Sequence, residues 1–139
     1  KENYTQKKIE IPPSVIKWNV NDEPPSIKLC DEISSESERN ICFQQKLLRL
    51  IYDNIDFSEI TVEKKLNDTL ILSLLIDQYG KISFLNTSIS FQIKSQIPLI
   101  DTILKKAISE LPIILPATKT NIGIQVSSRL ELPLILTTN

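Results

Sequence analysis

The stretch that decides the fold is residues 122–136, with the sequence IGIQVSSRLELPLIL. Every even position in it is apolar except Ser128, and the odd positions are mostly small or polar. A period of two turns alternate side chains to opposite faces of a strand, one toward a core and the other toward water. The pattern predicts one strand much longer than the about 5–6 residues that are usual. A small sheet rarely needs such a length for its own core, which indicates that part of this strand pairs with something else.

The segments before this strand alternate between helical and extended patterns. Residues 98–111 carry apolar side chains three and four apart, which predicts a one-sided helix. Residues 69–77 and 82–90 have strand character, and Gly80 supplies the positive φ of the tight turn between them. Ser35 followed by Glu38 fits a capping box, which predicts a helix from about residue 35 to residue 54.

These elements predict an α+β domain over residues 34–139. In it, two helices pack on one face of a small, mainly antiparallel three-stranded sheet, in the order helix, strand, strand, helix, strand. Residues 1–33 are predicted to be an extended amino-terminal segment or linker, because the proline pairs at 12–13 and 24–25 block helix formation.

The composition argues against several classes of function. The 139 residues include 16 basic and 17 acidic side chains. This balance does not produce the positive electrostatic field that would attract nucleic acid. The chain has no histidine, which removes the commonest general base and metal ligand, and only two glycines, too few for a phosphate-binding loop. We therefore expect no enzyme, no cofactor and no metal site, and no binding of nucleic acid.

Cys30 and Cys42 are the only cysteines. Two cysteines alone cannot complete a four-ligand zinc site. They are a candidate disulfide between the extended segment and the first helix, which would imply an oxidising compartment. Two buried free thiols are the alternative, and the spacing does not decide between them.

Residues 40–136 resemble the carboxy-terminal domain of TonB-family energy transducers. The hairpin at 72–82, LSLLIDQYGKI, is similar to that family's strand–turn–strand, in which an Ile-Asp pair precedes a turn glycine. Residues 100–117 resemble its second helix and proline-containing exit, and 132–134, Leu-Pro-Leu, match the end of its last strand. Residues 21–25 and Cys30 resemble the segment before this domain in some Gram-negative members. The chain departs from the family at Phe57-Ser58, where a Tyr-Pro pair is usual.

The resemblance implies a periplasmic domain in the cell envelope of a Gram-negative bacterium, either part of an anchored transducer or a free relative. In the family, the last strand receives a short motif near the amino terminus of an outer-membrane transporter, for energy transduction or tethering. Main-chain hydrogen bonds supply such binding. Carried over by position, the peptide-binding strand comprises Gly123, Ile124, Gln125, Val126, Ser127, Ser128, Arg129, Leu130 and Glu131.

The domain is alternatively a scaffold or subunit-contact module of the envelope, with the same fold and no transducer role. The last strand is then paired inside its own sheet or in a homodimer. Pro133 has no N–H to give to a ladder, so we expect it where pairing has ended or on an open edge.

Overall fold

A computed structural model of the chain describes residues 2–5, 22–119 and 123–138. Its elements, in order, are β1 (Glu2–Thr5), β2 (Asp22–Glu23), α1 (Lys28–Asp31), α2 (Glu36–Asn54), the 3-10 helix η1 (Phe57–Glu59), β3 (Thr61–Val62), β4 (Asn67–Ile76), β5 (Ile82–Ser88), α3 (Phe91–Gln96), α4 (Ile100–Ser109), β6 (Ala117–Lys119), β7 (Ile124–Val126) and β8 (Ser128–Thr138).

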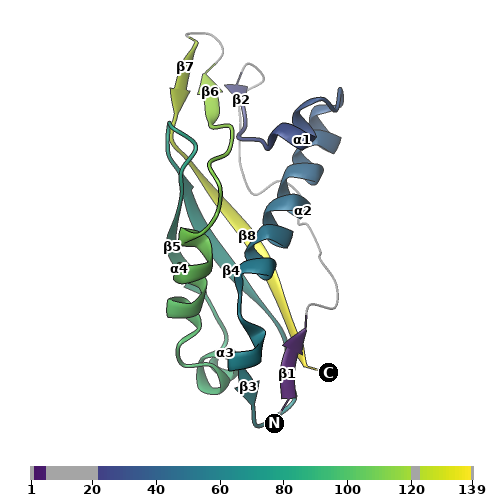
Figure 1. The fold of residues 1–139 in the computed structure, drawn as a ribbon, viewed down its shortest axis with the longest axis vertical. Helices are drawn as coiled ribbons and strands as arrows, with labels where there is room; N and C mark the ends of the chain where they lie inside the picture. The colour runs from purple at the N-terminus through teal and green to yellow at the C-terminus, as the bar shows by residue number, and fades with distance from the viewer. Residues whose placement is uncertain (1, 6–21, 120–122, 139) are drawn as a thin grey trace.

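The main layer is an antiparallel sheet with the strand order β3-β1-β8-β4-β5. Its centre is the three-stranded unit β8-β4-β5, and α2 and α4 lie together in front of it in Figure 1. This confirms the predicted α+β fold, with two helices on one face of an antiparallel sheet. The short strands β1 and β3 extend the sheet beyond β8, near the carboxyl end of the chain.

The helices begin where local chemistry predicts. The Ser35 hydroxyl accepts a hydrogen bond from the backbone N–H of Glu38 (3.4 Å), which caps α2. Helix α4 buries Ile100, Leu104 and Ala107 on the side that faces the sheet. Removing this apolar stripe from water is the main force that docks the helix.

The core lies between the helices and the inner face of the sheet. Helix α2 supplies the aromatic side chain of Phe43, which is 1% exposed. Eight even-numbered residues of β4 and β8 form the sheet side of the core and are buried: Leu70, Leu72, Leu74, Ile76, Leu130, Leu132, Leu134 and Leu136.

The hairpin between β4 and β5 turns as predicted at Gly80, whose φ is 87°. The Asp77 carboxylate accepts hydrogen bonds from the backbone N–H groups of Tyr79 (2.8 Å) and Lys81 (2.9 Å). The Gly80 carbonyl accepts the N–H of Ile114 (2.9 Å), which ties the turn to the segment after α4.

The prediction of one continuous strand over residues 122–136 is wrong. Residue 122 lies outside the described residues, 124–126 form β7, and β8 begins only at Ser128. The division has a physical cause, because the partner strand β4 turns away after Ile76, which stands opposite Ser128. Residues before Ser128 therefore lose β4 as a partner, and β7 pairs with β6 instead.

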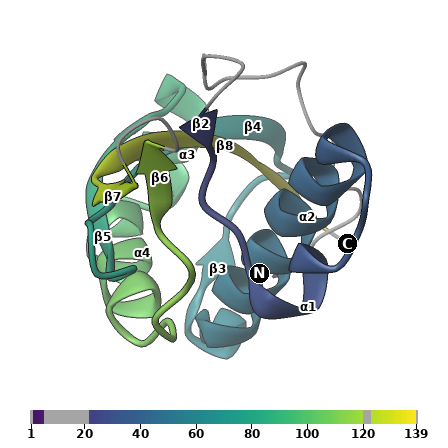
Figure 2. The ribbon, with the colours of Figure 1, turned by 90° about the horizontal axis from the view of Figure 1, so that it is seen from above.

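The strands β2, β6 and β7 form a second, smaller antiparallel sheet, seen from above in Figure 2. Ser26, after β2, and Leu115, before β6, continue the pairing of these two segments through two backbone hydrogen bonds of 3.0 and 2.9 Å. Residues 6–21 of the expected extended segment lie outside the described residues. Helix α1 shows that the remainder is not extended throughout, because it forms one helical turn over Lys28–Asp31.

Candidate functional site

Strand β8 has one edge paired along its length and the other edge paired only at its end. On one side, β4 pairs with β8 from Ser128 to Thr137. On the other side, which we call the outer edge, β1 pairs only with Thr137 and Thr138. No strand among residues 2–5, 22–119 and 123–138 pairs with the outer edge over 128–136.

The hydrogen bonds of β8 show which residues point their backbone groups outward. The Thr138 N–H donates to the carbonyl of Leu66, on the β4 side (2.9 Å). Successive residues of an antiparallel strand turn their N–H and C=O groups to opposite edges. The backbone N–H and C=O groups of the even-numbered residues of β8 therefore point toward β4. The backbone groups of four odd-numbered residues point toward the outer edge: Arg129, Glu131, Pro133 and Ile135.

A hydrogen bond from helix α2 supports this assignment and limits how far the unpaired part of the outer edge extends. The Tyr52 hydroxyl donates to the carbonyl oxygen of Ile135 (2.8 Å), and Tyr52 does not belong to the sheet. Pro133 carries no N–H. Up to Pro133, the outward groups without a partner in the described residues are the N–H and C=O of Arg129 and Glu131 and the C=O of Pro133. We call residues 129–133 the open window.

Pro133 lies at a position where its missing N–H costs the ladder with β4 no hydrogen bond. It stands opposite Ile71 in the register, but the position of its missing N–H points to the outer edge. Proline on an exposed strand is one of the devices by which proteins prevent uncontrolled edge pairing. The structure thus places Pro133 on an open edge, as expected from the sequence.

Side chains of the open window divide cleanly between the two faces. Leu130 and Leu132 are fully buried beneath the helices. Arg129 and Glu131 are exposed on the opposite face of the sheet. The buried leucines hold the strand in place, so its outward backbone groups have fixed positions.

Tyr52 is itself held rigidly. Its side chain is 6% exposed, and its ring stacks on Phe57 with 6.1 Å between the centroids. Burial raises the pKa of Tyr52 to about 12, so the hydroxyl stays protonated and remains a donor well into the alkaline range.

The predicted peptide-binding residues do not form one edge. Gly123 lies in a turn with φ 67°, and Ile124, Gln125 and Val126 form β7 of the second sheet. Ser127 separates the two strands, and only Ser128, Arg129, Leu130 and Glu131 lie on β8. The candidate site is therefore shorter at its amino end than the sequence indicated and reaches further, to Pro133.

Sequence reasoning missed the role of Tyr52 and Ile135. These residues are 83 positions apart, and no local pattern links them. The nearest signal in the sequence was Pro133. It indicated an edge position but did not show that Tyr52 occupies the outward carbonyl of Ile135.

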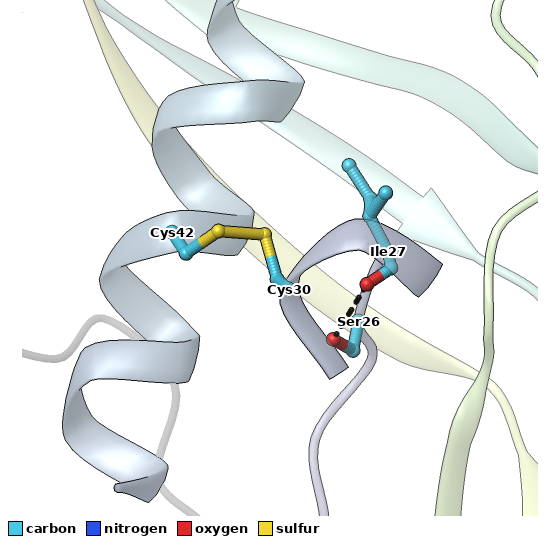
Figure 3. Close-up of a disulfide and its surroundings, with 4 residues drawn as sticks. All are labelled: Ser26, Ile27, Cys30 and Cys42. Carbon is cyan, nitrogen blue, oxygen red and sulfur yellow. Dashed lines mark hydrogen bonds between the residues drawn. A yellow bond between two sulfur atoms is a disulfide. The ribbon is translucent and has the colours of Figure 1, made fainter. Parts of the chain in front are cut away.

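Figure 3 shows the disulfide between Cys30 and Cys42, which confirms the candidate pairing. The bond joins α1 to α2 with 5.7 Å between the Cα atoms, and Cys30 is fully buried. It fixes the segment that carries β2 against the longest described helix. Beside it, the Ser26 hydroxyl donates to the carbonyl of Ile27 (3.3 Å).

A hollow of about 270 Å³ opens near β2 and the start of α2. Glu23, Asp31, Glu36 and Arg39 contribute to its lining. Arg39 is already engaged, since its Nη1 donates to the carbonyl of Ile33 (2.7 Å).

Two further findings concern the described part of the chain. It contains no group of three or more His, Cys, Asp or Glu side chains arranged to hold a metal ion. None of its helices is both long enough and apolar enough to cross a membrane.

Comparison with known proteins gave no match to a family model, to a curated protein or to a solved structure.

Proposed function

We propose that this protein is a TonB-like domain of the cell envelope that captures an extended segment of a partner by adding it as a strand to the outer edge of β8. The partner is an outer-membrane transporter or another envelope protein. The bound segment serves energy transduction or tethering. The role is binding through main chain, not catalysis.

The open window is the observation that carries this proposal. Its outward N–H and C=O groups have no partner in the described residues, and an exposed edge of this kind is a template for an incoming strand. The buried leucines between these groups keep the template rigid, which reduces the entropy lost on binding.

The disulfide supports a location outside the reducing cytoplasm. Structural disulfides persist in oxidising compartments, including the bacterial periplasm, and are rare in the cytosol. Burial of Cys30 supports a structural bond. A periplasmic location is consistent with a partner in the outer membrane.

A titration of isotope-labelled protein tests the proposal. Peptides from the amino termini of the same organism's outer-membrane transporters are added, and backbone amide shifts are mapped. We expect the largest shifts at Arg129 and Glu131, with slower hydrogen exchange at both. Shifts confined to other elements, or none with any such peptide, would contradict strand addition at β8.

The variant Glu131→Pro tests whether the peptide pairs with the outer edge of β8. It removes one of the outward N–H groups of the window, and that group takes no part in the ladder with β4. We expect a folded protein whose peptide affinity falls about fivefold or more, because one hydrogen bond is lost and the Glu131 carboxylate is removed with it. Unchanged affinity would show that the peptide does not pair with this edge.

The alternative is a scaffold in which a second copy occupies the same edge. The window can pair with itself across a two-fold axis, and its brevity keeps such a contact small. Sedimentation equilibrium without peptide distinguishes the two roles. A stable dimer broken by Glu131→Pro would favour the scaffold.

A further inference from the structure

We propose that the outer edge of β8 selects its peptide by charge order, and this inference rests on the proposed strand addition. The peptide runs antiparallel to β8. It carries a basic residue opposite Glu131 and, two positions later, an acidic residue opposite Arg129. The recognised motif is therefore basic-x-acidic in an extended segment.

The exposed charges of the window have no opposite charge across the sheet on the β4 side. Glu131 stands opposite Ser73, and Arg129 stands opposite Leu75. Directly opposed residues on one face of a sheet interact, and opposite charges there are favourable while like charges are unfavourable. The remaining cross-strand position for each charge is on a strand added at the outer edge.

The orientation follows from the strand already on that edge. β1 pairs with the last residues of β8 in the antiparallel sense. An antiparallel peptide meets Pro133 first, then Glu131 and then Arg129. The basic residue therefore precedes the acidic one in the peptide.

The position between the two charges has a different requirement. It stands beside Leu130 and points to the buried face of the sheet. A β-branched apolar residue such as valine suits that position. Pro133 and the Tyr52–Ile135 hydrogen bond end the ladder beyond it, so a short segment fills the window.

Two short peptides of the same composition test the inference, one with the centre Thr-Lys-Val-Glu-Thr and one with Thr-Glu-Val-Lys-Thr. Their affinities for the labelled protein are measured by amide shifts at low salt. We expect the first peptide to bind about tenfold more tightly, because two favourable pairs replace two unfavourable ones. The preference should shrink at high salt, which screens exposed charges.

The double variant Arg129→Glu, Glu131→Arg exchanges the two exposed charges and leaves the buried leucines untouched. We expect it to reverse the peptide preference. Equal binding of both peptides at residues 128–133 would overturn the charge reading while strand addition stands. Failure of both peptides to bind either protein would overturn strand addition as well.

Discussion

At the scale of single residues, Gly80 is the position least able to accept a side chain. Its φ is positive, and a Cβ added there would lie 1.8 Å from the carbonyl oxygen of Ile114. That oxygen belongs to the backbone and cannot swing away as a side chain would. We expect Gly80→Ala to lower the free energy of unfolding by about 3 kcal/mol, from strain and displaced backbone together. Urea denaturation measures the loss.

Gly123 is the matched control for Gly80. Its φ is also positive, at 67°, but a Cβ there would meet nothing within 4 Å. Gly123→Ala therefore carries the conformational cost alone, about 1 kcal/mol. Equal losses at the two sites would contradict the role assigned to the close contact at Ile114.

Tyr52 makes stability depend on pH in the alkaline range. Burial raises its pKa from 10.0 to about 12. The stabilisation is fully present below pH 10 and is lost as the pH rises through 12, because the unfolded chain ionises first. The difference in pKa corresponds to roughly 2–3 kcal/mol. Denaturation curves at pH 8 and near pH 12 should show this loss.

Tyr52→Phe isolates that contribution. The variant leaves the carbonyl of Ile135 without its donor, so we expect a loss of about 1 kcal/mol at pH 8. Between pH 8 and pH 12 it should then lose less stability than the parent protein. The same alkaline loss in both would show that Tyr52 does not cause it.

At the scale of elements, Pro133 sets where pairing along β8 stops. Pro133→Ala restores an outward N–H without altering the ladder with β4. A peptide that spans residues 129–133 should then bind about fivefold more tightly, by one added hydrogen bond. We also expect more self-association at high protein concentration, which sedimentation measures.

Pro112→Ala is the control for this variant, because Pro112 lies in the exposed segment after α4 and outside every described strand. It should change neither peptide affinity nor self-association. An unchanged affinity in Pro133→Ala would mean that the ladder already ends before residue 133.

The elements also show what the sequence could and could not predict. The cap at Ser35 and the turn at Gly80 depend on neighbouring residues, so local patterns revealed both. The break at Ser127 depends on where β4 turns, which is remote in sequence. Helix α3 escaped prediction because it is only six residues long and leaves Phe91 82% exposed, so it lacks a clear apolar period.

The candidate site follows the same division. Alternation over residues 122–136 predicted the buried face of β8, and Pro133 predicted either an end of pairing or an open edge. The outward backbone groups of the open window can be identified only once β4 is known to pair with the other edge of β8. The closure by Tyr52 requires the packing of α2 against β8, which no periodicity encodes.

At the scale of the whole molecule, the disulfide attaches the second sheet to the helical layer. Cys30 and Cys42 are separated by 12 positions in the sequence, and closing this loop restricts the unfolded state by roughly 3 kcal/mol. We expect the paired variant Cys30→Ser, Cys42→Ser to lose about that much stability. Its loss should concentrate where β2 and Ser26 meet β6 and Leu115.

Hydrogen exchange localises the effect. The amides of Ser26 and Leu115, which bond each other's carbonyls, should exchange faster in the serine variant or after reduction. Leu130 and Leu132 should keep their protection, because β4 holds them independently of the disulfide. Added reductant should change the parent protein and leave the variant unaffected. Equal loss of protection at Ser26 and Leu130 would mean that the two sheets unfold together and that the bond stabilises the molecule as one unit.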